Sequence, residues 1–250
     1  MSKLGLVGTR DDADVVNPST SNIIVDLGEV IARISQLLTV NRSGNLLDVV
    51  KFDWGLGQVS PFVLGADDDV ALVNEPLAND SLSCRLTTSA IPGHYSGFYR
   101  YLSSVETDGL GIEWWFAVVY NPQDIYLITD VYDGSEMYVY KMRYKYSTKI
   151  LSIYTAPGGV WYDVATINLA TSYEVFNKVK MIVDLKNHCY NRIVFNGVTY
   201  TVNTQYAQHV TSTLPAFIEV ITRLENQSAS ISQIAVGKVV VTQNEELAVC

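Results

Sequence analysis

Carboxylates are the first side chains in this sequence whose type and spacing could support catalysis, because glycosidases work with a pair of them. In retaining enzymes the two carboxyl groups lie about 5 Å apart, and alternating acidic residues on one strand commonly supply them. Asp130, Asp133 and Glu136 come closest to this pattern, but they straddle the glycine turn of TDVYDGSE. Glu113 and Glu219 each stand alone in an apolar run. We therefore expect a solvated hairpin end and no catalytic carboxylate pair.

The histidines do not complete a catalytic motif either. His94, His188 and His209 lie in expected loops, away from any nucleophile elbow. The sequence also lacks the glycine-rich, P-loop and HExxH patterns of nucleotide- and zinc-dependent enzymes. We therefore predict that the protein is not an enzyme.

Three cysteines, Cys84, Cys189 and Cys250, are too few and too scattered for a disulfide framework or a zinc site. Free cysteines are usually buried. We expect reduced thiols that are buried or terminal.

Aromatic side chains offer a different chemistry, because the sequence contains 16 tyrosines and 4 tryptophans. Such rings fill the half-buried surfaces of sheets, and they can also stack on sugar rings. For most of them packing in the core is the first expectation. The candidates for a glycan-binding or interface surface are Trp115, Tyr126, Tyr132, Tyr138, Tyr140, Tyr144, Trp161 and Tyr162.

The segment EMYVYKMRYKYS is the most informative of these regions, because a strand places alternate residues on opposite faces. One face carries Tyr138, Tyr140, Met142, Tyr144 and Tyr146. The other face carries Val139, Lys141, Arg143 and Lys145. An aromatic side and a basic side suit either a concave glycan surface or a subunit interface.

Composition limits the classes of partner. The 250 residues are 48% hydrophobic and 17% charged, and no apolar run approaches the length of a membrane span. With 17 Lys and Arg against 26 Asp and Glu, the net charge of -9 repels phosphate backbones. We expect neither nucleic-acid binding nor membrane insertion. The beginning, MSKLGLVGTRDDAD, has no apolar segment typical of a signal peptide, so we expect synthesis in the cytoplasm.

Residues 1–45 differ from the rest of the chain. A polar stretch at the start predicts an extended arm, and DLGEVIARISQLL then has apolar residues at helical spacing, with Asp26 and Glu29 as a capping box. The stripe of this short helix consists of Leu27, Val30, Ile31, Ile34, Leu37 and Leu38. The helix either packs on its own domain or docks onto a neighbouring subunit. We predict a separate assembly or docking segment.

Residues 46–250 are predicted to form one β-sandwich domain. Fifteen segments with period-two patterning follow one another, separated by turn residues and without intervening helices. This organisation predicts an all-β fold, an antiparallel two-sheet sandwich of the jelly-roll type. The surest element is the hairpin around Asn196 and Gly197, whose residue types suit a two-residue type I′ turn.

The run KVKMIVDLKNHCYNRIVFNGVTYTV resembles the laminin G-like or concanavalin A-like lectin jelly roll, as do KFDWGLGQVS, SLSCRLTT, SGFYRYL and GIEWWFAVV before it. The resemblance covers about residues 46–243. It implies a sandwich used by glycan-binding modules, glycosidases, adhesins and viral structural proteins.

The resemblance also implies a structural calcium between an acidic entry loop and the last strand. Asp53, Asp67 and Asp69 are weak candidates for its oxygen ligands. The last strand, however, offers Lys238 where the family would place an acid. We expect a solvated loop and no cofactor.

Two functional hypotheses follow from these observations. The first is a non-catalytic structural or adhesion protein of a large homo- or hetero-oligomeric assembly. The assembly that we favour is a phage-like virion, in which the protein would decorate the capsid or form part of the tail. The second is a stand-alone carbohydrate-binding module with a cell-surface glycan as its partner. The predicted location is accordingly a virion or a cell-surface assembly.

Overall fold

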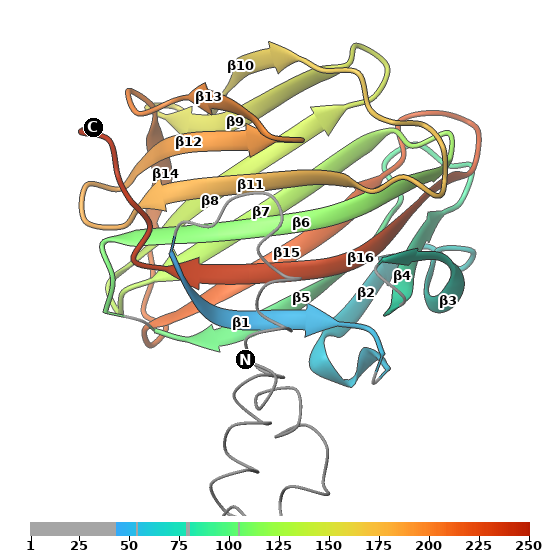
Figure 1. Cartoon of the computed structure of the whole chain (residues 1–250), viewed down its shortest axis with the longest axis horizontal. Coiled ribbons are helices and arrows are strands. Elements are labelled where there is room, and N and C mark those ends of the chain that lie inside the picture. Colours follow the sequence, from blue (N-terminus) through green and yellow to red (C-terminus); the bar gives the residue numbers. More distant parts are fainter. Residues whose placement is uncertain (1–43, 54, 79–80, 105) are drawn as a thin grey trace, which may run out of the picture. The chain divides into compact units, whose positions relative to one another are not determined.

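A computed structural model describes residues 44–53, 55–78, 81–104 and 106–250. These residues contain sixteen strands and one short 3-10 helix, η2 (Leu56–Gln58). Every pairing between the strands is antiparallel, and the strands form two stacked layers (Figure 1). The predicted fold class, an all-β antiparallel sandwich, is confirmed.

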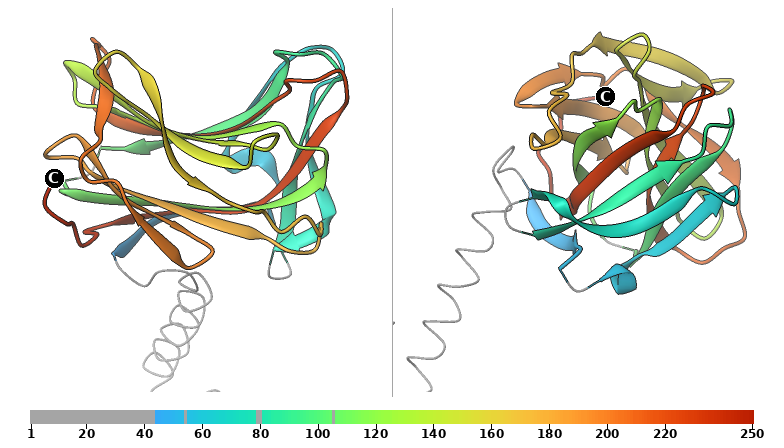
Figure 2. Two further views of the ribbon diagram at one scale, coloured as in Figure 1. Left: turned by 90° about the horizontal axis from the view of Figure 1, so that it is seen from above. Right: turned by 90° about the vertical axis from the view of Figure 1, so that its right-hand side faces the viewer.

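The layer that lies farther from the viewer in Figure 1 is called the back sheet. Its strands, in spatial order, are β2 (Ser60–Leu64), β5 (Tyr95–Ser103), β15 (Phe217–Glu225), β7 (Asp124–Tyr132), β8 (Glu136–Lys145), β9 (Ile150–Ala156) and β10 (Val160–Thr166). Figure 2 shows that this sheet bends away from the other layer at both ends, so that its outer surface is concave.

The nearer layer is called the front sheet. Its strands are β13 (Val198–Thr201), β12 (Cys189–Phe195), β11 (Asn177–Asp184), β6 (Gly109–Tyr120), β16 (Ser232–Gln243), β4 (Ser81–Thr88) and β3 (Asp69–Ala78), with β1 (Asn45–Lys51) beside β16. A further strand, β14 (Tyr206–Thr211), pairs with β8, β9 and β12 and so joins the two sheets.

The core lies between the sheets and is formed by every second residue along the strands. On β15 buried and half-buried residues alternate along the whole strand, because one face meets the front sheet and the other faces outward. Trp114 of β6, Met142 of β8 and Leu224 of β15 are fully buried members of this core. The sheets are therefore held together by apolar burial, at about 25 cal/mol per Å² of apolar area removed from water.

The predicted hairpin turn is confirmed. Phe195 and Val198 are register partners, and both Asn196 (φ 46°) and Gly197 (φ 86°) have positive φ, as a type I′ turn requires. The strand β14 was not predicted. Its sequence YAQHVT has few apolar residues, and four of its six residues are exposed, so it carries no alternating pattern.

The expectation for the cysteines was partly wrong. Cys189, at the start of β12, and Cys250 form a disulfide with a Cα–Cα distance of 6.7 Å, whereas Cys84 is free and buried. The two cysteines are 61 residues apart in sequence, but the tail after β16 runs back along β12. Asn191 donates a hydrogen bond to the carbonyl of Ala248, and this return of the chain is what brings the thiols together.

The predicted helix over Asp26 to Leu38 lies outside the described residues, and the boundary at residue 46 stays a prediction. In the described ranges no helix is long and apolar enough to cross a membrane.

Candidate functional site

The outer face of the back sheet brings charged and aromatic side chains together in rows across the strands. One row runs through Arg223 of β15, Tyr126 of β7, Arg143 of β8, Ser152 of β9 and Asp163 of β10, each the register partner of the next. Directly opposed residues on neighbouring strands have Cβ atoms about 4.5–5.5 Å apart. Five strands thus contribute to one continuous surface.

The neighbouring row continues this surface. Ile128, Lys141, Tyr154 and Trp161 are successive register partners on β7, β8, β9 and β10. The ring of Trp161 lies 5.3 Å from that of Tyr154 and 6.0 Å from that of Tyr126, measured between centroids. Trp161 therefore connects the two rows.

Three cations stack on these rings. The Lys141 ammonium lies 4.9 Å from the Tyr126 centroid and 5.5 Å from that of Trp161. The Arg143 guanidinium lies 4.1 Å from the Trp161 centroid, and the Arg223 guanidinium lies 4.5 Å from that of Tyr126. All of these distances lie within the range of a cation–π interaction. The six residues of the cation–aromatic cluster are Tyr126, Lys141, Arg143, Tyr154, Trp161 and Arg223.

Carboxylates at the edge of the cation–aromatic cluster offset only part of its positive charge. Arg223 forms an ion pair with Glu225 at 2.6 Å, and Arg143 lies 4.0 Å from Asp124. Among the described residues, no carboxylate lies within ion-pair distance of Lys141. Burial, together with the nearby Arg223, lowers the pKa of Lys141 from its usual value.

Two carboxylates lie beside the cluster on the same face. Asp130 of β7 and Glu219 of β15 are register partners, with Tyr101 of β5 next to Glu219 in the same row. Burial raises the pKa of Asp130 to about 7, and the charge of Glu219 adds to this effect. Burial also raises the pKa of Glu219. From the sequence we grouped Asp130 with Asp133 and Glu136 and left Glu219 alone, so only the order of the strands places Asp130 opposite Glu219.

A second aromatic group borders the carboxylates. Phe217 stacks on Tyr132 at 4.1 Å and meets Tyr101 edge-on at 5.4 Å, and Tyr99 lies 5.0 Å from Tyr101. Tyr101 is 54% exposed, so part of this group faces solvent. The concave face thus has rings on both sides of its acidic centre.

The predicted aromatic residues separate by their position. Tyr126, Tyr132 and Trp161 lie on the outer side of the back sheet, and of these Tyr126 is buried by its neighbours, with 6% of its surface exposed. Tyr140 and Tyr144 are buried in the core, so their assignment to a surface was wrong. The reason is strand parity: their face of β8 packs inward, and the basic face points outward.

The other three candidates lie elsewhere. Trp115 is buried on the outer side of the front sheet, where the Lys238 ammonium lies 3.3 Å from its ring centroid. Tyr138 lies at one end of the sandwich and stacks on His188 at 3.7 Å. Tyr162 is 44% exposed, but it faces the side of β10 opposite to Trp161. None of the three belongs to the cation–aromatic cluster.

Sequence reasoning missed four members of the cluster as site residues: Lys141, Arg143, Tyr154 and Arg223. A usable signal existed for two of them. Lys141 and Arg143 alternate with buried residues on β8, and burying unpaired cations is costly, so they belong on the outer face. Tyr154 and Arg223 come close to Lys141 and Arg143 only because of the order of the strands in the sheet, which no local pattern in the sequence indicates.

The outer side of the front sheet also brings charged side chains together around a ring. The Lys178 and Lys238 ammonium groups lie 3.9 and 3.3 Å from the Trp115 centroid, and the Trp115 indole donates a hydrogen bond to Glu113.

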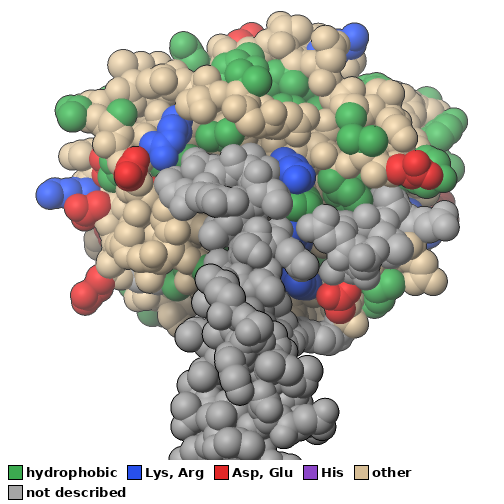
Figure 3. All heavy atoms as spheres, viewed as in Figure 1, with side chains coloured by type: hydrophobic (Ala, Val, Ile, Leu, Met, Phe, Trp, Pro, Cys, Tyr) green, Lys and Arg blue, Asp and Glu red, His purple; other side chains and the backbone are tan. Residues whose placement is uncertain are grey.

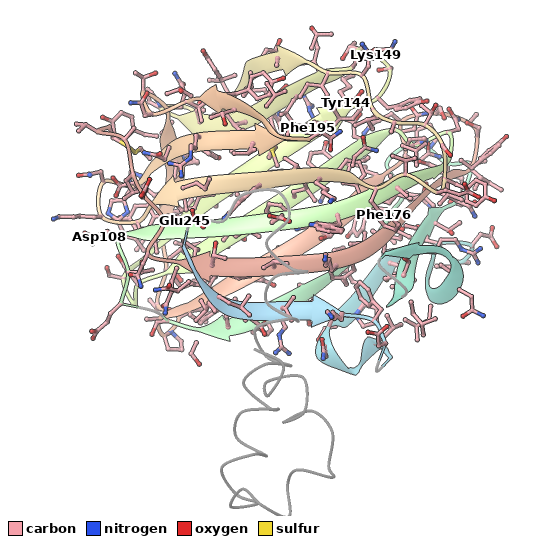
Figure 4. All side chains as sticks on the ribbon, viewed as in Figure 1. Asp108, Tyr144, Lys149, Phe176, Phe195 and Glu245 are labelled. Carbon is pink, nitrogen blue, oxygen red and sulfur yellow. A yellow bond between two sulfur atoms is a disulfide. The ribbon has the colours of Figure 1, made fainter. Side chains whose placement is uncertain are left out.

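Around the grey residues in Figure 3, acidic and basic side chains are visible at several separate places on this side. Glu245 and Asp108 lie at one end of the sandwich, whereas Tyr144 and Lys149 lie toward its opposite side (Figure 4). A pocket of about 440 Å³ at the Asp108 end is lined by Asp133, Lys186 and other residues, and it is separate from the cation–aromatic cluster.

The weak calcium candidates do not converge. Asp53 is exposed and accepts a hydrogen bond from the amide of Leu82 at 3.1 Å. Asp67 is exposed in the turn before β3, and Asp69 is exposed as the first residue of that strand. In the described part of the chain, three potential ligand atoms come together only at Asp184, Cys189 and Cys250, two of which form the disulfide. The expectation of a solvated loop without a cofactor stays a prediction.

Comparison with protein-family models and with curated proteins finds no match. Solved structures do match. A protein of unknown function with a galectin-like fold, from Bacillus subtilis, is 12% identical over 81% of this chain and 97% of that chain, with a TM-score of 0.52. The exoplasmic domain of VIP36, solved with Ca²⁺ and Man3GlcNAc, is 9% identical over 82% of this chain and 92% of that chain, with a TM-score of 0.51. The chain therefore has a lectin-like jelly-roll fold, whereas the laminin G-like resemblance stays a prediction.

The prediction that the protein is not an enzyme is corrected by these comparisons. A carbohydrate esterase from the Shiga toxin-encoding bacteriophage phi24B also matches, at 12% identity over 81% of this chain and 100% of that chain, with a TM-score of 0.49. A jelly-roll fold hosts many unrelated functions, so the fold does not show that this chain lacks an enzymatic activity. Asp130 and Glu219 also oppose each other on neighbouring strands, a placement that we did not expect from the sequence.

Proposed function

We propose that this chain is a lectin-like carbohydrate-binding protein and that the concave face of its back sheet binds glycan. The observation that carries the proposal is the set of three rings, Tyr126, Tyr154 and Trp161, held 5.3–6.0 Å apart around Trp161. Trp161 and Tyr154 are half-buried, so part of each ring faces solvent.

Ring stacking and polar contact are both available on this surface. An aromatic ring buries the apolar face of a sugar, and neighbouring donors fix the orientation of its hydroxyl groups. The rings and the donors of the cation–aromatic cluster belong to neighbouring strands of one sheet, so they are held without a loop movement. Binding should therefore need little reorganisation of the protein.

A glycan array with the full chain tests this proposal. We expect a defined set of glycans to bind, and we expect Tyr154→Ala to reduce their signal strongly because it removes one of the three rings. Tyr120→Ala is the matched control, since Tyr120 is 58% exposed at the end of β6, on the other sheet. Equal binding by the two variants, or no binding by the wild type, would contradict the proposal.

We propose as a second function that the protein is a subunit of a large assembly, such as a phage-like virion. The amphipathic stripe from Leu27 to Leu38 favours it, because leaving several aliphatic side chains in water forfeits about 1.5–3 kcal/mol each. A neighbouring subunit would cover the stripe, and the concave face would stay available to a cell-surface glycan.

Light scattering of the full chain tests this second proposal. We expect an oligomer, and we expect Ile31→Asp with Ile34→Asp to give a monomer with an unchanged unfolding temperature of the sandwich, because each aspartate would place an unpaired charge in the interface. A monomeric wild type, or a variant whose sandwich unfolds, would contradict it.

A further inference from the structure

We infer that the glycan bound by the concave face is anionic and that Lys141, Arg143 and Arg223 bind its carboxylate or sulfate group. The inference rests on the proposed glycan-binding function and adds the chemical class of the ligand. It starts from the signs and positions of the charges in the cation–aromatic cluster.

The cluster opposes the charge of the whole chain. The protein has 17 Lys and Arg against 26 Asp and Glu, a net charge of -9, yet three cations from β8 and β15 meet here over the rings of Tyr126 and Trp161. Of the nearby carboxylates, Glu225 pairs closely with Arg223, and Asp124 lies 4.0 Å from Arg143. The described residues place no carboxylate within ion-pair distance of Lys141.

These cations repel one another. Partial burial disfavours the charged form of Lys141, and the charges of Arg223 and Arg143 add to this effect, whereas Glu225 and Asp130 act in the opposite direction. The Nε atoms of Arg143 and Arg223 are buried and have no hydrogen-bond acceptor among the described residues. An anionic group between the three side chains would offset the repulsion, and its oxygens would accept charge-assisted hydrogen bonds.

The rings beside the cations favour a sugar over other anions. A sugar ring that stacks on Trp161 would have its substituents next to Arg143, whose guanidinium lies 4.1 Å from the same ring. A nucleic acid would have a phosphate at every residue and would meet the repulsion of a protein with a net charge of -9. A sugar with one carboxylate or sulfate group therefore fits this surface best.

Pairs of glycans that differ only in charge test the inference. The probes are oligogalacturonate against its methyl ester, and a sulfated galactan oligosaccharide against its desulfated form, each titrated into the full chain by calorimetry. We expect at least one anionic probe to bind and its neutral partner to bind at least about tenfold more weakly, as charge-assisted hydrogen bonds predict. Raising the ionic strength from 0.05 to 0.5 M, in round numbers, should weaken the anionic complex.

Variants identify the groups responsible. Lys141→Gln and Arg143→Gln should each weaken the anionic probe about tenfold and weaken its neutral partner less, because glutamine still offers a donor to a hydroxyl group but carries no charge. Lys186→Gln removes one positive charge from an exposed turn outside this face, and it should change neither affinity. If a glutamine variant unfolds, Arg143→Lys and the salt dependence of the wild type still decide the question.

The outcomes separate the inference from the proposed function. Equal affinity for the charged and neutral partners, with Tyr154→Ala still disruptive, would overturn the anionic class and leave glycan binding intact. Binding of a nucleic acid or an acidic peptide but of no glycan would overturn both proposals. Binding that prefers the anionic probe but ignores Lys141→Gln and Arg143→Gln would overturn the assignment to this cluster.

Discussion

The two faces of β8 use the same short segment in opposite ways. On the inner face Tyr140, Met142 and Tyr144 are buried against the front sheet. On the outer face Lys141 and Arg143 keep contact with solvent and stack on rings from β7, β9 and β10. The strand therefore contributes to the core with every second residue and to the candidate site with the residues between.

The comparison shows that an abundance of tyrosine does not mark a binding surface. Tyr140 and Tyr144 of β8 are core residues, and the rings of the candidate site come from other strands. What marks the outer face is its cations, because a lysine or arginine without a partner is costly to bury. The aromatic residues that matter are those that share a face with these cations.

The largest expected effect is on the inner face. Tyr140 is fully buried and meets Tyr190 edge-on at 5.5 Å. Tyr140→Ala should lower the free energy of unfolding by about 3–5 kcal/mol, because it leaves a cavity in the core. Urea denaturation measures this, with Tyr140→Phe as the control that keeps the ring and should cost less than about 1.5 kcal/mol. A loss below 1 kcal/mol for Tyr140→Ala, on the order of an exposed site, would contradict the difference between the faces.

On the outer face the expected loss is in binding. Trp161→Ala should weaken the best glycan from the array by roughly 2 kcal/mol, about thirtyfold in Kd, because truncating a central tryptophan has effects of this size. Calorimetry gives the Kd, and Trp161→Phe should retain part of the affinity because it keeps a ring. If Trp161→Ala lowered stability as much as Tyr140→Ala but left the Kd unchanged, the outer face would be structural.

A pH-dependent effect comes from Asp130 on the same outer face. Its pKa is raised to about 7 by burial and then by Glu219, whereas an unfolded aspartate titrates near 4. Between about pH 4 and 7 the folded state binds more protons than the unfolded state, so stability falls as the pH rises through this window and then levels.

Asp130→Asn should remove this slope and gain on the order of 1 kcal/mol at pH 8, a value reduced for the partial exposure of the side chain. Unfolding temperatures from pH 4 to 8 measure it, and Asp67→Asn is the control because Asp67 is exposed in a turn. A variant that is less stable than the wild type at pH 8 would show that the charged form of Asp130 is favoured in the fold.

Much of the fold could be predicted from the sequence, because strands and turns depend on local patterns. The alternation of apolar residues located fifteen strands, and Asn196 with Gly197 located a turn that needs positive φ at both positions. β14 was missed because YAQHVT has few apolar residues and obtains its partners from three distant strands.

The candidate site could be predicted only in part. The alternation of residues along β8 separates its two faces, but alternation alone does not say which face packs inward. Our prediction placed the aromatic face on a surface, whereas in the structure this face packs into the core. Arg223 and Tyr126 are 97 residues apart in sequence and lie opposite each other only because β15 pairs with β7. The pairing of Asp130 with Glu219 depends on the same long-range contact, which no local pattern contains.

The smallest expected effect belongs to Tyr162, the sequence neighbour of Trp161. The two side chains point to opposite sides of β10, since Trp161 opposes Tyr154 whereas Tyr162 opposes the buried Ile153. Tyr162→Ala should therefore change the free energy of unfolding by about 0.5 kcal/mol or less, as is usual for an exposed position, and should leave the Kd for glycan unchanged. Because Tyr162 and Trp161 share a strand and have similar size, a matched pair of calorimetric titrations isolates the effect of the face. A loss of affinity in Tyr162→Ala equal to that in Trp161→Ala would mean that binding depends on the edge of β10 as a whole and not on its concave side.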